Sequence, residues 1–232
     1  MALDVSALSL GFFCKCMLGA TTCIVQVVGD VVQGQSDEKN IVFVIDKKSD
    51  VSDEQVADLE SVLSNISIDL PDINEKFHWV LTVIISFTNA CGNIVDTCFI
   101  ALKSAIWTTR LPQINVLNGE IEVVDDVNAV SRLPNYEDFP VTCSIINIGT
   151  GFCIDPKEEE MQAGSILVHI IIGSNISKVV TTNSGLCSSL LLRNIIKNGQ
   201  EHGKILFEKI NDSLKVGAES TQMAQNIPKS FF

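Results

Sequence analysis

The chain has 232 residues, of which 46% are hydrophobic and 19% charged; this composition excludes an intrinsically disordered protein and suffices for a core without disulfides. The net charge of −12 argues against a protein that grips nucleic acid alone, because phosphate contacts need clustered Lys and Arg, and the 16 basic residues here are scattered. The mean hydropathy of +0.30 fits either a strand-rich core or a chain that buries apolar surface in stable interfaces.

The first half of the chain alternates between β-rich and helical patterns. The predicted elements are strands at 23–32 and 40–45, a helix at 52–63, a strand at 79–87 and a helix at 94–108. Within the first strand, Gly29 and Asp30 predict a bend. Ser52 is the expected N-cap of the first helix, because its hydroxyl can accept from free backbone N–H groups.

The second half predicts short strands and one long helix. Its expected elements are an extended piece at 111–112, a strand at 121–124, a polar loop at 125–138, a strand pair at 141–148 and 152–154, an acidic turn at 157–160, a hairpin at 165–172 and 176–182, and a helix from Ser188 or Ser189 to about Leu214. Helices grouped beside mixed strands indicate an α+β layered fold. We expect one domain over residues 1–216 and a flexible C-terminal tail at 217–232.

The eight cysteines are expected to be free thiols rather than a disulfide framework. Cys23, Cys98 and Cys143 lie inside apolar segments, where a free cysteine behaves as a small hydrophobe. No C-x-x-C pair supports a zinc site. The apolar residues 7–13 follow Asp4 rather than a basic residue, so no signal peptide is expected. No run reaches the roughly 18 apolar residues of a membrane span, so a membrane partner is not expected either.

Five passages, in this order, resemble the RNase PH family. They are residues 18–25 (LGATTCIV), 78–81 (HWVL) with 91–96 (CGNIVD), 101–112 (ALKSAIWTTRLP), 154–160 (IDPKEEE) and 199–206 (GQEHGKIL). Within the family the chain is most similar to non-catalytic ring subunits of the RNA exosome, of the component-seven type. It departs from the family in lacking an R-x-D-G-R motif and in the short span before Trp79.

This resemblance implies an RNase PH-like (ribosomal protein S5 domain 2-like) fold and a structural role. The expected function is to support 3′-to-5′ RNA processing and degradation by the exosome. The expected partners are other RNase PH-type exosome subunits in a hetero-oligomeric ring, cap subunits, and RNA indirectly or weakly. The expected location is the nucleus, including the nucleolus, and the cytoplasm.

The chemistry of the residues argues against catalysis. Phosphorolysis needs cations to offset the developing anion, and the resemblance implies arginines near the helix at 52–63 in active relatives. Here that helix carries acidic side chains and no Lys or Arg; the acidic ones are Asp53, Glu54, Asp58 and Glu60. We therefore predict no catalytic residue, no cofactor and no metal.

Two carboxylates remain as candidates for the alternative, an active phosphorolytic 3′-to-5′ exoribonuclease. Asp96 and Asp155 can act as acid and base or bind Mg²⁺. Their structural interpretation is that Asp96 favours a helix N-terminus and Asp155 bonds its own backbone in a turn. The histidines His78, His169 and His202 are separate in sequence and are expected in the core or on the surface. A small-molecule enzyme of related layering remains a third interpretation, with no motif to support it.

Overall fold

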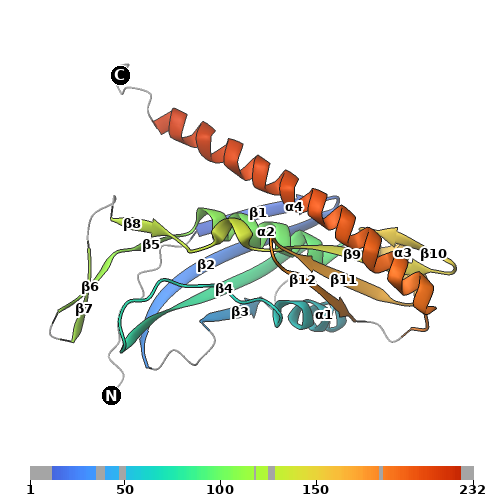
Figure 1. Cartoon of the computed structure of the whole chain (residues 1–232), viewed down its shortest axis with the longest axis horizontal. Helices are drawn as coiled ribbons and strands as arrows, with labels where there is room; N and C mark the ends of the chain where they lie inside the picture. Colours follow the sequence, from blue (N-terminus) through green and yellow to red (C-terminus); the bar gives the residue numbers. More distant parts are fainter. Residues whose placement is uncertain are drawn as a thin grey trace.

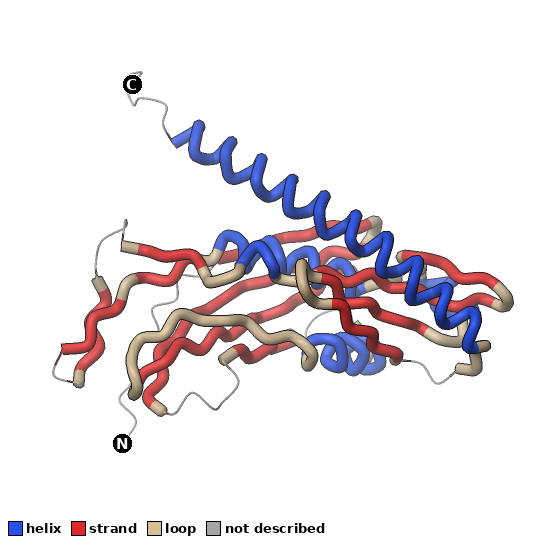
Figure 2. Tube along the Cα trace, viewed as in Figure 1, coloured by secondary structure: helices blue, strands red, loops and turns tan. Residues whose placement is uncertain are grey.

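The computed structural model describes residues 12–34, 40–46, 51–117, 119–124, 129–182 and 185–225. Within these residues, two four-stranded sheets form the framework of the protein (Figure 1, Figure 2). The first has the order β1-β2-β4-β3, with β1 at Phe12–Leu18, β2 at Thr21–Gln33, β3 at Ile41–Ile45 and β4 at Phe77–Asn89. The second has the order β10-β9-β11-β12, with β9 at Val141–Ile148, β10 at Gly151–Ile154, β11 at Leu167–Ile172 and β12 at Ser177–Thr181.

The remaining elements are helices and two short ribbons. The ribbons pair β5 (Arg110–Pro112) with β8 (Val130–Arg132) and β6 (Ile114–Leu117) with β7 (Glu120–Val123). The helices are α1 (Asp53–Leu63), α2 (Ile94–Thr108), α3 (Glu158–Ala163), α4 (Ser189–Gln225) and the single 3-10 turn η1 (Tyr136–Asp138). In the described part of the chain, no helix is long and apolar enough to cross a membrane. The predicted α+β architecture is confirmed.

The helix α2 lies between the two sheets and is buried on almost every side. Phe99, Ala101 and Leu102 are fully buried, and the helix contacts β1 and β2 of the first sheet and β9 of the second. A helix that is apolar all round belongs in the interior of a protein. The sequence predicted both ends of this helix correctly. Trp79 and Trp107 are also buried, as expected for core aromatic residues.

The helix α1 connects β3 to the parallel strand β4 and begins with a capping box. The backbone N–H of Gln55 donates to Ser52 Oγ at 3.2 Å, and the N–H of Ser52 donates to Gln55 Oε1 at 3.0 Å. These bonds satisfy donors that the first helical turn leaves free. The predicted role of Ser52 is therefore confirmed. Leu59, Val62 and Leu63 face the core.

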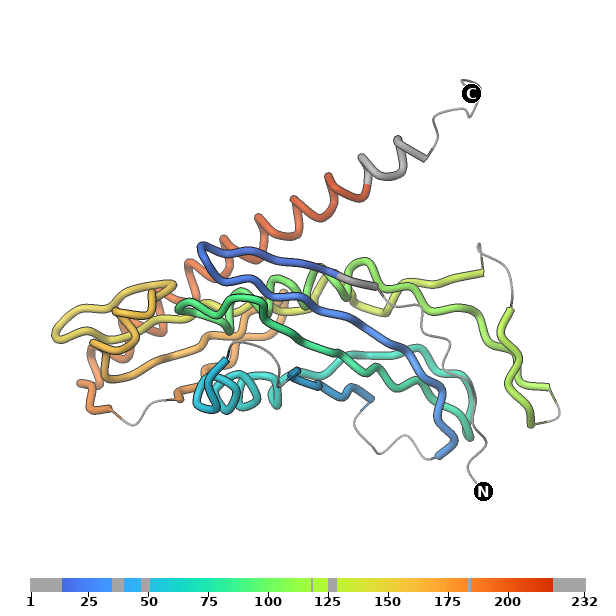
Figure 3. The backbone as a smooth tube through the Cα atoms, turned by 180° about the vertical axis from the view of Figure 1, so that it is seen from behind, coloured from blue at the N-terminus to red at the C-terminus, as the bar shows by residue number. Residues whose placement is uncertain are grey.

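Where the helix α4 crosses the second sheet, two glycines lie against β11 beside the buried Ile195. A Cβ atom built on Gly199 would lie 2.2 Å from Ile170 Cδ1, and one on Gly203 would lie 2.0 Å from Ile172 Cδ1. The two glycines therefore let the helix backbone approach β11 closely. Beyond this contact, the C-terminal half of α4 extends past the sheets (Figure 1, Figure 3).

Four sequence-based expectations differ from the structure. The helix predicted to end near Leu214 continues to Gln225, so the predicted tail at 217–232 is helical up to that residue, and its remainder lies outside the described residues. The bend predicted at Gly29 is absent, because β2 pairs with β4 without a bulge there. The described part of the loop at 125–138 contains β8 and η1, and the turn at 157–160 opens α3. In each case the local sequence pattern is weak on its own.

The cysteines are free thiols. Cys23, Cys98 and Cys143 are buried, as their apolar surroundings in the sequence predicted, whereas Cys91 is exposed. Burial raises the pKa of Cys143 to about 12, and the neighbouring Asp96 and Asp155 carboxylates act in the same direction. A thiol with so high a pKa is protonated near neutral pH and packs as an apolar group.

Candidate functional site

The two candidate carboxylates are brought together at the N-terminus of α2. Gly92, with φ of +80°, precedes the helix, and a Cβ there would lie 3.2 Å from the carbonyl oxygen of Pro156. Only glycine combines this left-handed conformation with so close an approach. The loop before α2 therefore packs directly against the turn that follows Asp155. Residues 62 positions apart meet here, since Asn93 Nδ2 donates to Asp155 Oδ1 at 3.3 Å and to Asp96 Oδ2 at 2.8 Å.

Asp96 is buried and accepts hydrogen bonds at all of its acceptor positions. Its Oδ1 accepts from Thr142 Oγ1 at 2.6 Å and from Ser144 Oγ at 2.7 Å. Its Oδ2 accepts from the backbone N–H of Ser144 at 2.9 Å and from the Asn93 amide at 2.8 Å. An ionised carboxylate offers about four acceptor sites, so none is left for a metal ion or a substrate proton. The side chain is only 4% exposed, which fits a structural role.

Asp155 differs from Asp96 in its surroundings. It is exposed and has φ of +53°, a conformation that Asp adopts more easily than most residues. Partial burial and then the charge of Asp96 raise the pKa of its carboxyl group, while the bond from Asn93 opposes this shift. Asp155 thus keeps a free acceptor position at the surface, but its partners in this network supply no positive charge.

His169 of β11 extends the network into the core. Its Nδ1 lies 2.7 Å from Ser144 Oγ, and its Nε2 lies 3.5 Å from Thr182 Oγ1. Because the single hydroxyl proton of Ser144 is donated to Asp96, Nδ1 of His169 must carry the proton and donate to Ser144. Burial lowers the pKa of His169 to about 4, although the Asp96 charge opposes this shift. The imidazole is therefore neutral near neutral pH.

The order of these groups excludes a Ser-His-Asp triad. In a triad the histidine lies between the serine and the aspartate and takes the serine proton. Here the Ser144 hydroxyl lies between Asp96 and His169 and donates to the carboxylate. Ser144 and His169 are also at most 1% exposed, so no substrate reaches them. The sequence analysis missed Thr142, Ser144 and His169 as a unit; polar residues inside two apolar strands were the available signal.

Positive charge is scarce around this network. Among the described residues, no Lys or Arg side chain forms a hydrogen bond or ion pair with Asp96 or Asp155. The helix α1 is acidic in its first turn and has no basic residue in its last. In the described ranges, no group of three or more His, Cys, Asp or Glu side chains is arranged to hold a metal ion.

One buried cation, Lys103, is engaged in contacts between elements of the fold. Lys103 of α2 is fully buried, and its Nζ donates to the carbonyl oxygens of Glu137 at 2.9 Å and of Phe139 at 2.6 Å. The same ammonium group lies over the ring of Phe207 in α4. Burial lowers the pKa of Lys103 to about 8, and the Asp138 and Glu137 charges oppose the shift. Lys103 therefore ties η1 and α4 to α2 and is not free to bind phosphate.

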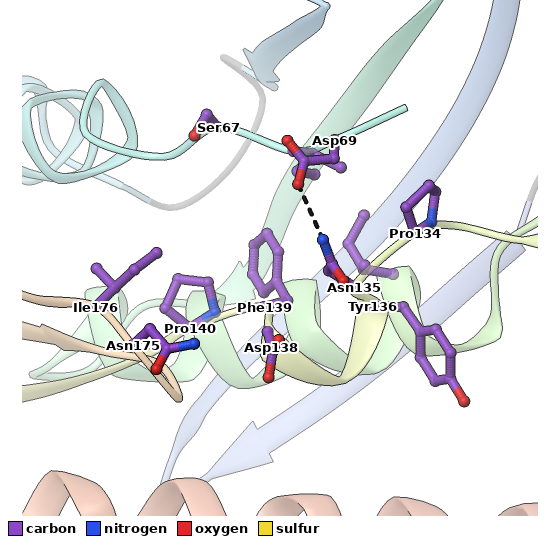
Figure 4. Close-up of a pocket in the computed structure, with 12 residues that line it drawn as sticks. Ser67, Asp69, Pro134, Asn135, Tyr136, Asp138, Phe139, Pro140, Asn175 and Ile176 are labelled. Atoms are coloured by element: carbon purple, nitrogen blue, oxygen red, sulfur yellow. Dashed lines mark hydrogen bonds between the residues drawn. The ribbon is translucent and has the colours of Figure 1, made fainter. Parts of the chain in front are cut away.

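A cavity of about 200 Å³ lies beside η1, and the charged side chains in its lining are acidic (Figure 4). Asp69 and Asp138 line it, and no Lys or Arg does. Asn135 Nδ2 donates to Asp69 Oδ2 at 3.0 Å, the bond drawn in Figure 4. The Phe139 ring stands between Pro140 and Asn135 in this view. A cavity that holds carboxylates without cations disfavours a phosphate ion.

Comparison with known proteins identifies the fold. No known family profile matches the chain. It is 30% identical over 93 residues, 38% of the chain and 28% of the relative, to a Dictyostelium discoideum protein named as an exosome complex exonuclease, RRP42. It is 28% identical over 124 residues, 52% of the chain and 42% of the relative, to the exosome complex component Rrp42 of Methanopyrus kandleri. The chain thus spans less than half the length of these curated relatives.

Solved structures extend the likeness over most of the chain. An archaeal exosome core has a TM-score of 0.63 at 20% identity, covering 83% of this chain and 78% of that one. An Archaeoglobus fulgidus exosome with RNA bound to the active site has a TM-score of 0.65 at 17% identity, covering 89% and 85%. Rice (Oryza sativa) Rrp46 has a TM-score of 0.54 at 14% identity, covering 85% and 86%. These matches do not distinguish the component-seven type from other ring subunits.

Proposed function

Since the chain has the RNase PH-like α+β fold of exosome subunits and resembles them in sequence, we propose that it is a non-catalytic RNase PH-type subunit of an RNA exosome ring. In this role it supports 3′-to-5′ RNA processing and degradation that other subunits catalyse. Its neighbours are other RNase PH-type chains and cap subunits. The proposal extends to a single RNase PH-like domain over residues 1–216 and to a location in the nucleus, including the nucleolus, and in the cytoplasm.

One observation carries the absence of catalysis: the acceptor positions of Asp96 are all occupied by Thr142, Ser144 and Asn93. A carboxylate with no free acceptor cannot take a proton or bind a metal ion without breaking this network. The acidic helix α1 supports the same conclusion, because its carboxylates repel an incoming phosphate.

Weak and indirect contact with RNA follows from the charge of the chain. Proteins gain affinity for nucleic acid when their Lys and Arg side chains neutralise phosphates and release the bound counterions. This chain has a net charge of −12, so it offers few such side chains. The described salt bridges already engage Lys197 and Lys215 with glutamates, although both pairs are exposed. Partner chains would therefore supply most of the positive charge that holds RNA in the assembled ring.

A phosphorolysis assay tests the proposal. The purified chain, alone and in complex with other ring subunits, is incubated with RNA and inorganic phosphate, and nucleoside diphosphates are measured. We expect none from the chain alone, and we expect the activity of the complex to be unchanged by Asp155→Asn in this chain. Release of nucleoside diphosphates by the isolated chain, lost in a folded Asp96→Asn variant, would establish the active exoribonuclease instead.

A further inference from the structure

Two of the three arginines of the chain lie opposite each other just beyond the end of α2. The antiparallel ribbon pairs Arg110 of β5 with Arg132 of β8. Residues directly opposite in such a pair place their side chains on the same face, with Cβ atoms about 5 Å apart, and like charges there repel each other. Both side chains are half-buried. Positive charge is therefore concentrated at one place in a chain whose net charge is −12.

The hydrogen bonds of this pair use only part of each guanidinium group. Arg110 Nη1 donates to the carbonyl oxygens of Trp107 at 3.0 Å and of Thr109 at 2.9 Å, at the C-terminus of α2. Arg132 Nη1 donates to the hydroxyl oxygen of Tyr136. The Nε and Nη2 atoms of both arginines make no hydrogen bond to a described residue. These N–H groups are therefore available to a further acceptor.

The aromatic neighbours add one more donor. Trp107 is 3% exposed, and its buried Nε1 atom has no hydrogen-bond partner within the described ranges. Its ring meets the Tyr136 ring edge-on, with the centroids 4.9 Å apart, and the Arg132 guanidinium group lies 4.8 Å from the centre of the Tyr136 ring. We call Trp107, Arg110, Arg132 and Tyr136 the arginine cluster. Its donors outnumber the acceptors around it.

Carboxylates do not balance the charge of the arginine cluster. In the part of the chain that the structure describes, neither arginine forms a salt bridge. Glu137 accepts from the Tyr136 hydroxyl at 3.0 Å, but its other oxygen lies 3.5 Å from Lys215 Nζ. In Figure 4 the Tyr136 hydroxyl points away from Asp69 of the acidic cavity. Burial and then the Arg132 charge lower the pKa of Arg110, while Tyr136 opposes this shift, so the two guanidinium groups repel each other.

Charge and shape select the anion that this cluster suits. A carboxylate presents two coplanar oxygens, which a single guanidinium fork satisfies. A phosphate monoester carries a charge of about −1.5 to −2 near pH 7, and its oxygens point in several directions. It can therefore neutralise two arginines and accept from both. We propose that the arginine cluster binds a phosphate dianion, as inorganic phosphate or as the terminal phosphate of a small ester.

This site is separate from the Asp96 network. Asp96 lies in the first turn of α2, and Arg110 follows the C-cap residue of the same helix. At about 1.5 Å per helical residue, the two positions are about 20 Å apart. A phosphate held by the arginine cluster therefore cannot reach Asp96 or its hydrogen-bond partners. The site adds a ligand to the chain without adding phosphorolysis, and it does not depend on the ring role.

Titration calorimetry of the full-length chain with inorganic phosphate, at constant ionic strength, tests the site. Arg132→Gln removes one guanidinium group, and Arg132→Lys keeps its charge but not its planar fork. Arg193→Gln, which alters an exposed arginine near the start of α4 and changes the net charge equally, is the matched control. Arg110 is left in place because it also caps α2. Melting curves without phosphate check that each variant is folded.

We expect Arg132→Gln to weaken phosphate binding by about 10-fold or more, because charge-assisted hydrogen bonds are lost. Arg132→Lys should bind with an affinity between those of Arg132→Gln and the wild type. Arg193→Gln should stay within about twofold of the wild type, since salt screens distant exposed charges. Phosphate at 100 times its dissociation constant should also raise the melting temperature of the wild type, and of Arg132→Gln by less.

Parallel titrations identify the ligand. Uridine 5′-monophosphate that binds at least as tightly as inorganic phosphate would support a terminal phosphate as the recognised group. Acetate that binds as tightly as phosphate would overturn the choice of a dianion. An RNA oligonucleotide with hydroxyl groups at both ends carries only phosphodiesters, and tighter, Arg132-dependent binding of it would make the diester the ligand instead. A folded wild type that binds no phosphate, or that binds it no better than Arg132→Gln, would overturn the site itself, while the proposed ring role would stand.

Discussion

The ammonium group of Lys103 in α2 lies 4.1 Å from the centre of the Phe207 ring in α4. A cation over an aromatic face is attracted by the ring quadrupole, and the attraction grows when water is excluded. The same group donates to two carbonyl oxygens near η1. One buried side chain thus joins three elements that are far apart in the sequence.

Replacing this lysine should destabilise the protein in a pH-dependent way. Lys103→Met should lower the free energy of unfolding at pH 7 by about 1 to 3 kcal/mol, because the carbonyl groups of Glu137 and Phe139 lose their donor. The pKa of Lys103 is about 8 in the folded protein and 10.5 ordinarily, so the unfolded chain binds more protons between these values. The wild type therefore gains stability as pH rises through this window, and the deficit of the variant should widen.

Urea unfolding at pH 7, 9 and 10 measures this deficit. Lys204→Met, which changes an exposed lysine on α4, is the matched control and should stay within about 0.5 kcal/mol of the wild type. A deficit that stays constant with pH would contradict the lowered pKa of Lys103.

The two candidate carboxylates should differ in their contribution to stability. Asp96→Ala should lower the free energy of unfolding by about 2 to 4 kcal/mol, because it leaves the buried donors of Thr142, Ser144 and Asn93 unpaired. Asp155→Asn should lower the free energy of unfolding by less than about 1 kcal/mol, because Asp155 is exposed and accepts a single long hydrogen bond from Asn93. Chemical denaturation gives both values, and equal losses would argue against the structural role of Asp96.

Acid should weaken the fold through His169. The pKa of this side chain is about 4 in the folded protein and 6.5 ordinarily, so the folded protein binds fewer protons between pH 4 and 6.5. The free energy of unfolding should therefore fall as pH is lowered through this range, by on the order of 3 kcal/mol in all. His169→Gln lacks this titration and should show a shallower fall in urea unfolding from pH 7.5 to 4.5. Parallel curves for the two proteins would exclude His169 as the source.

The two close-contact glycines of α4 should tolerate no side chain. Alanine favours a helix over glycine by about 1 kcal/mol, but a Cβ at position 203 meets Ile172 Cδ1 at 2.0 Å in a packed core. We expect Gly203→Ala to lower the melting temperature by several degrees. Gly217→Ala, where a Cβ has nothing within 4 Å, is the control and should raise it slightly. Stabilisation by both substitutions would mean that α4 lies farther from β11.

Local signals in the sequence predicted local structure well. Ser52 predicted the start of α1, and the apolar run at 79–87 predicted β4, in which every second side chain is buried. The two hairpins of the second sheet were predicted from their turns, as at Gly149, whose φ of +58° suits a tight hairpin, whereas the pairing of β9 with β11 that joins them was not predicted. The resemblance to RNase PH-type exosome subunits was confirmed at the level of fold.

Long-range relationships could not be predicted in the same way. Ser144 meets Asp96 across 48 residues and His169 across 25, and no spacing rule connects them. Gly29 looked like a bend because glycine is frequent in turns, yet it lies in a straight strand where a Cβ would sit 3.2 Å from Leu111 Cδ2. A glycine needed for space and a glycine needed for conformation look alike in a sequence.

If the chain is non-catalytic, as we propose, the saturated acceptors of Asp96 limit any attempt to engineer RNA cleavage into it. Adding arginines to α1 would supply the missing cations, but the buried carboxylate would still be held by Thr142 and Ser144. A designer would have to replace both hydroxyl residues as well, and thereby lose the hydrogen bonds that fix the start of α2 against β9. Substitutions that free the Asp96 carboxylate would therefore also destabilise the contact between α2 and β9.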